Sequence, residues 1–191
     1  MKRILVLCAL TLSMCAFAQP RLILQNQDPI SGCTSLGTSD VIVRNGMADR
    51  HPLKVSILAT QISDSWVYSL EIAVSEFTSK AIPEGGIFLI RTLSGNVYEL
   101  ANTRTEAESR DWVGTWIEGT SSKVYYNRAS YPVTREQLED ISSGVSKIRM
   151  QLLGSTFDTE FKKDKLGAAV GSFLTLIDSA ILSGSDIRSD F

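Results

Sequence analysis

Histidine and cysteine are scarce in this chain, and their scarcity excludes several kinds of active site. His51 is the only histidine, and the three cysteines are Cys8, Cys15 and Cys33. A zinc site needs several such ligands, so we expect no metal centre. His51 precedes Pro52 in a polar stretch, where an exposed loop histidine is the ordinary interpretation. The chain also lacks Gly-x-Ser-x-Gly, Ser-x-x-Lys and glycine-rich phosphate motifs, so it predicts no catalytic residue and no cofactor.

The amino terminus has the features of an export signal. Lys2 and Arg3 precede an apolar run, residues 4–17, that is too short to cross a bilayer. Ala16 and Ala18 place small residues at the −3 and −1 positions of a cleavage site. We therefore expect residues 1–18 to be a signal peptide that is cleaved before Gln19. The mature protein is then exported from the cytoplasm, into the periplasm or the extracellular space.

Loss of the signal would leave a single cysteine. Cys8 and Cys15 lie within residues 1–18, so Cys33 has no intramolecular partner and we expect no disulfide. A lipid anchor at Cys15 is not expected, because the residue before a lipidated cysteine is normally small and Met14 is not.

The charge balance argues against nucleic acid as a partner. Lys2 and Arg3 leave with the signal, so 19 basic residues become 17 against 21 acidic ones, a formal charge near −4. Nucleic-acid binding depends on a concentrated positive surface, which this chain lacks. We expect no transmembrane segment either, because residues 168–182, the most apolar later stretch, contain Ser172, Thr175, Asp178 and Ser179.

Most of the chain has the alternation of an antiparallel sheet. Residues 19–52 are predicted to be an extended polar arm with edge strands at 22–24 and 41–43, and Asn45-Gly46 to turn the second into a hairpin. Strands are expected at 53–59, 65–75, 112–117 and 124–127, and hairpins at 87–100 and 145–161. Residues 101–111 are polar and charged throughout, which predicts a solvated loop.

Two helices are expected in the last third of the chain. Thr134 and Gln137 form a capping-box pattern, and Gly144 is expected to end this short helix in the left-handed conformation. Further on, apolar residues recur at helical spacing and define one stripe: Leu166, Val170, Phe173, Leu174, Ile177 and Ile181. We predict one α+β domain, residues 53–182, with an antiparallel, curled β-sheet on which the short helix and the long C-terminal amphipathic helix pack. Residues 183–191 are expected to be a polar tail.

Part of the chain resembles a known group of proteins. The segments Tyr131-Pro132-Val133-Thr134, Gly144-Val145-Ser146-Lys147 and Phe161-Lys162-Lys163-Asp164-Lys165 are similar to small exported bacterial proteins of unassigned function. That group shares the order Tyr-Pro, short helix, hairpin, Phe-Lys-Lys-Asp-Lys and C-terminal helix. The resemblance spans residues 86–182 at most, and it implies the architecture without implying an activity.

Two tryptophans are candidate ligand-binding residues. Trp112 and Trp116 fall on one face of the expected strand 112–117, with Gly114 between them. Indole rings on an exposed sheet face can stack on sugars or contact a peptide, whereas large aromatic residues more commonly fill cores. Gly114 would leave a slot between the two rings.

Three lysines are the other candidate. Lys162, Lys163 and Lys165 precede the last helix, where the helix dipole disfavours cations. They could pair with the acidic short helix (Glu136, Glu139 and Asp140) or with Asp158 and Glu160. Alternatively, they and the free N–H groups of the helix could bind a phosphate, a carboxylate or a lipid headgroup.

The resulting prediction of function is an exported, non-enzymatic binding or interaction domain whose partner is a protein, a glycan or an anionic ligand. One alternative is a carboxylate-dependent hydrolase acting on a glycan, for which Asp158, Glu160, Glu71 and Glu99 are the candidate acids. Alternation against Phe157 and Phe161 instead points Asp158 and Glu160 to solvent. The other alternative is an inhibitor of a secreted hydrolase, with residues 101–111 as a protruding loop.

Overall fold

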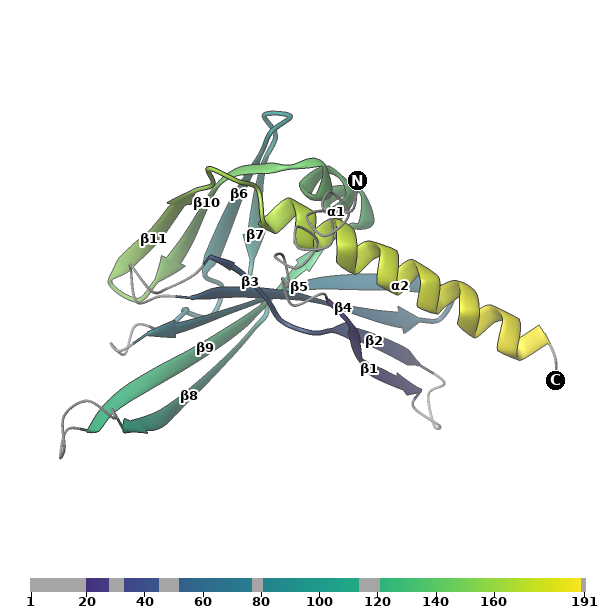
Figure 1. The fold of residues 1–191 in the computed structure, drawn as a ribbon, viewed down its shortest axis with the longest axis horizontal. Coiled ribbons are helices and arrows are strands. Elements are labelled where there is room, and N and C mark those ends of the chain that lie inside the picture. The colour runs from purple at the N-terminus through teal and green to yellow at the C-terminus, as the bar shows by residue number, and fades with distance from the viewer. Residues whose placement is uncertain (1–19, 28–32, 45–51, 77–80, 114–120, 190–191) are drawn as a thin grey trace, which may run out of the picture.

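Two antiparallel sheets and two helices make up the part of the chain that the computed structural model describes, residues 20–27, 33–44, 52–76, 81–113 and 121–189 (Figure 1). This arrangement confirms the predicted α+β class. The larger sheet has the strand order β1-β2-β4-β5-β9-β8, with β3 paired to β4. Its strands are β1 (Leu22–Gln27), β2 (Thr34–Thr38), β3 (Val41–Arg44), β4 (Leu53–Ile62), β5 (Ser65–Glu76), β8 (Arg104–Val113) and β9 (Ser121–Val133).

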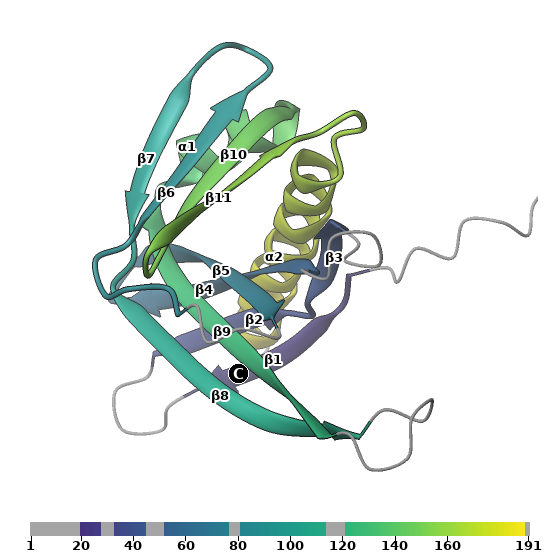
Figure 2. The same ribbon diagram turned by 90° about the vertical axis from the view of Figure 1, so that its left-hand side faces the viewer.

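The smaller sheet has the order β11-β10-β6-β7. Its strands are β6 (Ile87–Thr92), β7 (Val97–Ala101), β10 (Val145–Leu152) and β11 (Ser155–Glu160). The hairpins predicted within 87–100 and 145–161 are both confirmed, as β6–β7 and β10–β11. Figure 2 shows the smaller sheet above the larger one, with α2 behind.

The segment predicted to be a polar arm contributes three strands to the larger sheet. β1 pairs with β2, β2 pairs with β4, and β3 pairs with β4. The predicted edge strands at 22–24 and 41–43 are confirmed as β1 and β3, whereas β2 was not expected. β3 and β4 pair antiparallel, as predicted for a hairpin around Asn45-Gly46, and those two residues lie outside the described part of the chain.

Residues 101–111 are not a loop, and this prediction is wrong. Residues 104–113 form β8, which pairs with β9 from Arg104↔Ser130 to Val113↔Ser121. β8 is the last strand in the order of the larger sheet. Charged residues are common on edge strands because they discourage pairing with another chain. The polar composition of residues 101–111, which suggested a loop, is therefore typical of an edge strand.

The short helix α1 (Arg135–Ser143) begins as the sequence predicts. Thr134 accepts a hydrogen bond from Gln137 N, and Gln137 Oε1 accepts one from Thr134 N at 2.9 Å, which is a complete capping box. Gly144 follows the helix with φ 141° and ψ 144°, not in the left-handed helical conformation that we expected. The difference arises because the chain passes directly into β10 and must already be extended at Gly144.

The long helix α2 (Leu166–Ser189) packs on the sheet with the predicted stripe. Leu166, Val170, Phe173, Leu174 and Ile177 are buried, and Ile181 is partly buried against the same core. α2 contacts β2, β3 and β4 of the larger sheet as well as α1. Its backbone remains helical through residues 183–189, which were predicted to belong to a tail. Residues 166–183 are long and apolar enough to span a membrane by length and composition alone, so the absence of a transmembrane segment stays a prediction.

One hydrophobic core joins both sheets and both helices. The rings of Phe88, on β6, and Tyr131, on β9, are fully buried and lie 5.3 Å apart between centroids, so they connect the two sheets directly. Burial without a hydrogen-bond partner among the described residues raises the pKa of the Tyr131 hydroxyl, because the phenolate would be poorly solvated there.

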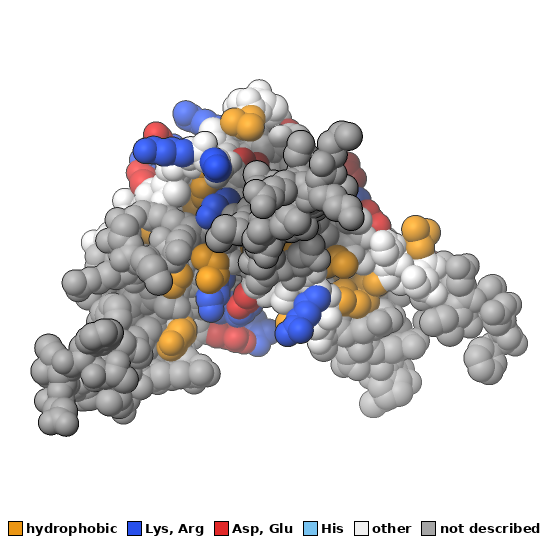
Figure 3. Space-filling model, in the orientation of Figure 1, with side chains coloured by type: hydrophobic (Ala, Val, Ile, Leu, Met, Phe, Trp, Pro, Cys, Tyr) orange, Lys and Arg blue, Asp and Glu red, His pale blue; other side chains and the backbone are white. Residues whose placement is uncertain are grey.

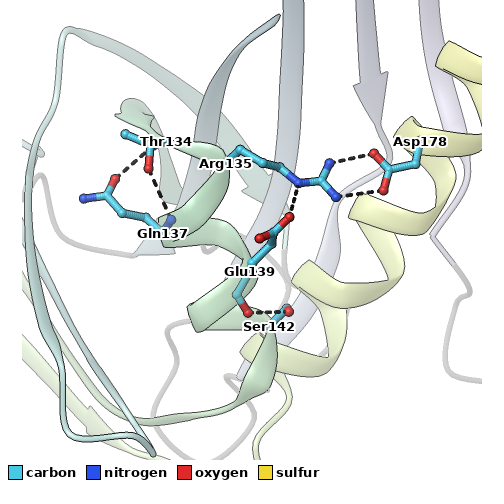
Figure 4. Close-up of polar contacts among 6 residues, drawn as sticks. All are labelled: Thr134, Arg135, Gln137, Glu139, Ser142 and Asp178. Carbon is cyan, nitrogen blue, oxygen red and sulfur yellow. Dashed lines mark hydrogen bonds and ion pairs between the residues drawn. The ribbon is translucent and has the colours of Figure 1, made fainter.

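A polar contact joins the two helices (Figure 4). Arg135 Nη1 and Nη2 donate to the two carboxylate oxygens of Asp178 at 2.6 and 2.8 Å, which is a bidentate pair between α1 and α2. Arg135 Nε also donates to Glu139 at 2.8 Å. These charge-assisted hydrogen bonds, the one with Asp178 above all, raise the pKa of the Arg135 guanidinium above its usual value.

We expect Arg135→Met to lower the free energy of unfolding by about 1–2 kcal/mol, since hydrogen bonds between charged groups are worth more than neutral ones but solvent screens this pair. Chemical denaturation should show the change. Glu139→Gln keeps the Arg135–Asp178 pair and should cost less than about 0.5 kcal/mol. Equal losses for the two variants would contradict a role for the interhelical pair.

Candidate functional site

The face of the larger sheet opposite the hydrophobic core carries polar side chains in two rows. Along β4, β5 and β9 successive residues alternate between the two faces, so Ile57, Ile72 and Tyr131 are buried while their neighbours point away from the core. The first row crosses four strands in register and contains Ser56, Glu71, Ser130 and Arg104. The second row lies next to it and contains Lys54, Ala73, Arg128 and Glu106.

Hydrogen bonds and ion pairs hold these side chains in place. Arg128 donates to Asp40 Oδ2 at 2.6 Å, and Ser56 Oγ donates to Asp40 Oδ1 at 2.9 Å. On the neighbouring strand Arg104 pairs with Glu106. The two guanidinium groups therefore each have a carboxylate partner.

Six of these side chains line a hollow of about 250 Å³: Ser56, Glu71, Arg104, Glu106, Arg128 and Ser130. Its lining comes from strands as far apart in the sheet order as β1, which contributes Ile23, and β8, which contributes Arg104 and Glu106. Figure 3 shows acidic and basic side chains gathered at the lower centre of the molecule, below the middle strands. In Figure 1 the β8–β9 pair and the β1–β2 pair leave this region on opposite sides. We call this feature the polar hollow.

Glu71 is the carboxylate at the centre of the first row. It is half-buried, and loss of solvation raises its pKa above the usual value. The hydrogen bond with Ser130 and the charges of Arg128 and Arg104 oppose this rise, whereas Glu106 adds to it. Glu71 thus combines partial burial with a position beside charges of both signs.

The raised pKa of Glu71 predicts a dependence of stability on pH. The folded state holds the proton of Glu71 to higher pH than the unfolded state, so stability falls as the pH rises above about 4.5, through the raised pKa. We expect Glu71→Gln to remove this loss, so that the variant gains stability relative to the natural protein at pH 7 but not at pH 4. Chemical denaturation at the two pH values measures the change. A stability difference between Glu71→Gln and the natural protein that is the same at both pH values would contradict the raised pKa of Glu71.

The structure describes the predicted lysines but only part of the predicted tryptophan pair. Trp112 lies in β8 opposite Ser122, while its side chain and all of Trp116 lie outside the described residues. Lys162 and Lys163 are exposed and Lys165 is half-buried at the start of α2. Asp164 Oδ1 accepts a hydrogen bond from Gly167 N at 2.8 Å, so the chain's own carboxylate already occupies one of the N–H groups that an anion would use.

Three of the acidic residues proposed to pair with those lysines, Asp140, Asp158 and Glu160, have other partners. Arg149 donates to both carboxylate oxygens of Asp158, at 2.7 and 2.8 Å, and Lys147 donates to Glu160 at 3.1 Å. Asp140 accepts from Ser94 and Asn96 of the β6–β7 turn and from Tyr98 of β7. Asp158 and Glu160 are exposed, as alternation predicted.

The candidate acids Glu71 and Glu99 are not brought together. Glu71 is on β5 of the larger sheet, whereas Glu99 is on β7 of the smaller one. The carboxylate that shares the polar hollow with Glu71 is Glu106, which sequence reasoning did not consider. The signal that could have found it is the alternation of Arg104, Glu106 and Glu108 with smaller residues, which is compatible with a strand.

Comparison of the chain with protein-family models, curated proteins and solved structures finds no match.

Proposed function

We propose that this protein is an exported, non-enzymatic binding domain and that the polar hollow is its ligand-binding surface. The observation that carries the proposal is the set of polar side chains from β4, β5, β8 and β9 that line one hollow, with a half-buried carboxylate, Glu71, among them. Hydrogen-bonded partners hold Arg128 and Ser56 in fixed positions. Such preorganisation lowers the entropy lost when a ligand binds.

The ligand that best fits this lining is a glycan. The polar hollow offers carboxylate acceptors, guanidinium donors and the hydroxyl groups of Ser56 and Ser130, while Ile23 and Leu58 add apolar surface. A sugar presents hydroxyl groups that both donate and accept, together with apolar ring faces, so it suits such a mixture. A strongly charged ligand suits it less, because Arg104 and Arg128 already have carboxylate partners. We also propose that the larger sheet curls around the hollow, which would bring β1 and β8 toward one ligand.

The test is binding of purified protein to a panel of neutral oligosaccharides, measured by isothermal titration calorimetry. We expect saturable binding to at least one member, weakened about tenfold or more by Glu71→Gln, because a lost hydrogen bond to a charged group is worth about 1.5–3 kcal/mol. Glu99→Gln is the matched control, since it makes the same change on the other sheet. Failure of every oligosaccharide to bind, or equal effects of both variants, would contradict the proposal.

A carboxylate-dependent glycan hydrolase is the second candidate, favoured because Glu71 and Glu106 line one hollow and burial raises the pKa of Glu71, as a general acid requires. Release of reducing ends from the same oligosaccharides, abolished by Glu71→Gln, would establish this activity. Binding without release supports the non-enzymatic domain. For the inhibitor alternative, residues 101–111 do not supply the protruding loop, because residues 104–113 form a strand.

Export itself is tested by the amino terminus of the protein recovered from outside the cytoplasm. We expect that terminus to be Gln19, because Ala16 and Ala18 satisfy the cleavage pattern. Mass spectrometry of the recovered protein measures it, and an intact residue 1 would contradict the proposal.

A further inference from the structure

The exposed face of the smaller sheet places two positive charges directly opposite each other. Lys147, on β10, is the register partner of Arg91, on β6. Like charges at directly opposed positions on neighbouring strands repel each other and destabilise the pair. The arrangement therefore lowers stability unless something negative lies between or above the two side chains.

Three acidic residues on the same face neutralise this charge only in part, and one of them, Glu99 on β7, makes no ion pair with a described residue. Glu160, opposite Lys147 on its other side, accepts a hydrogen bond from Lys147 Nζ at 3.1 Å. Asp158 is held by both donors of Arg149. Arg91 is exposed, and within the described part of the chain its guanidinium makes no ion pair or hydrogen bond. Toward the residues that the structure describes, all the donors of this guanidinium are therefore available.

Arg91 and Lys147 also border a shallow hollow. The hollow measures about 160 Å³ and is lined by Leu89, Val97, Ile148 and Arg149 in addition to the two opposed cations. Val97 is 54% exposed, so apolar surface lies beside the charges and faces solvent. Figure 3 shows Lys and Arg side chains at the upper left of the molecule, with acidic side chains among them. Lys162 is exposed just beyond the end of β11 and adds a further positive charge at the β11 edge of the smaller sheet.

We propose that Arg91 and Lys147 bind one phosphate group of a larger ligand, whose apolar part contacts Leu89 and Val97. The planar guanidinium fork suits two oxygens of a phosphate, and the ammonium group of Lys147 has donors beyond the one it gives to Glu160. A bound phosphate removes the repulsion between the two cations. This site lies on a different sheet from the polar hollow and does not depend on the function proposed for it.

Thermal unfolding of the purified protein in sodium phosphate and in sodium chloride of equal ionic strength tests the site. A ligand that binds only the folded state stabilises it by RT ln(1 + [L]/Kd), so Tm rises as the ligand concentration exceeds Kd. We expect phosphate to raise the Tm of the natural protein more than chloride does, and Arg91→Gln to lose the part of this rise that exceeds the general stabilisation by an excluded anion. In NMR titrations, the affinity of Arg91→Gln for phosphate should fall about tenfold, since charge-assisted hydrogen bonds are lost.

Arg21→Gln is the matched control, because Arg21 is an exposed arginine at the start of the larger sheet and its loss changes the net charge equally. The control should keep the full response to phosphate. Identical responses to phosphate and chloride, or equal responses of Arg91→Gln and the natural protein, would overturn the proposal. In the absence of phosphate, Arg91→Gln should unfold at the same or a higher temperature, which separates the site from a loss of folding.

Vesicles distinguish the source of the phosphate. Co-sedimentation with phosphatidylglycerol vesicles but not phosphatidylcholine vesicles, lost in Arg91→Gln, supports a lipid headgroup. Saturable effects of free phosphate without sedimentation support a soluble phosphate ester. The site is contradicted if Arg91→Gln sediments with the vesicles as strongly as the natural protein and free phosphate has no specific effect.

Discussion

Phe173→Ala should lower the free energy of unfolding by about 3–5 kcal/mol, the largest effect expected of any single change considered for this protein. Phe173 is completely buried on the face of α2 that meets the sheet. Its removal costs the transfer energy of the ring and leaves a cavity that the surrounding residues fill only in part. A loss of this size is a large share of the 5–15 kcal/mol that typically stabilises a domain.

Urea or guanidinium denaturation measures this loss. Ser172→Ala is the matched control, because Ser172 precedes Phe173 on the same helix and is exposed. Its hydroxyl donates to Ala168 O at 2.9 Å within the helix, so we expect a change within about 0.5 kcal/mol. A small effect of Phe173→Ala would mean that α2 is not docked on the sheet.

Gly167→Ala and Gly171→Ala should act in opposite directions, although both glycines lie in α2. A Cβ on Gly167 would lie 2.7 Å from Ile141 O and 3.0 Å from Gly144 Cα, and it would also clash with the Asp164 carboxylate. The backbone of α1 and its end cannot move aside without disturbing the core. We therefore expect Gly167→Ala to cost about 1–3 kcal/mol or more, as overpacking does.

A Cβ on Gly171 meets only ordinary contact, with Ser142 Cβ at 3.7 Å. Alanine is a better helix former than glycine by about 1 kcal/mol, so Gly171→Ala should stabilise the protein by roughly that amount. Thermal and chemical denaturation of the two variants test the close approach of α1 and α2. Similar changes of the same sign would show that the two helices are farther apart at Gly167 than described.

Elements with a strong local signal could be predicted from the sequence. The alternation at 65–75 became β5, and the capping box at Thr134 begins α1. In both cases the information lies within a few residues, as side-chain period or as a hydrogen bond to the adjacent backbone. The prediction for residues 101–111 is wrong because an edge strand is defined by its neighbour, β9, and not by its own hydrophobicity.

Single residues of the candidate site could be predicted from the sequence, but not which of them lie side by side. Glu71 was recognised as an acidic residue on a strand, but its neighbours Arg104 and Arg128 come from β8 and β9. Alternation gives the face on which a strand residue lies, yet it does not give the strand beside it or the register between them. The opposition of Arg91 and Lys147 depends on register in the same way.

The amino-acid sequence by itself determined the α+β class, the apolar stripe of α2 and the scarcity of histidine and cysteine ligands, since each follows from composition or from a period of a few residues. Only the tertiary structure decided that Glu71 shares a hollow with Glu106 and that α1 meets α2 at Gly167. These arrangements depend on contacts between residues far apart in the chain, whose partners are selected by the packing of one common core.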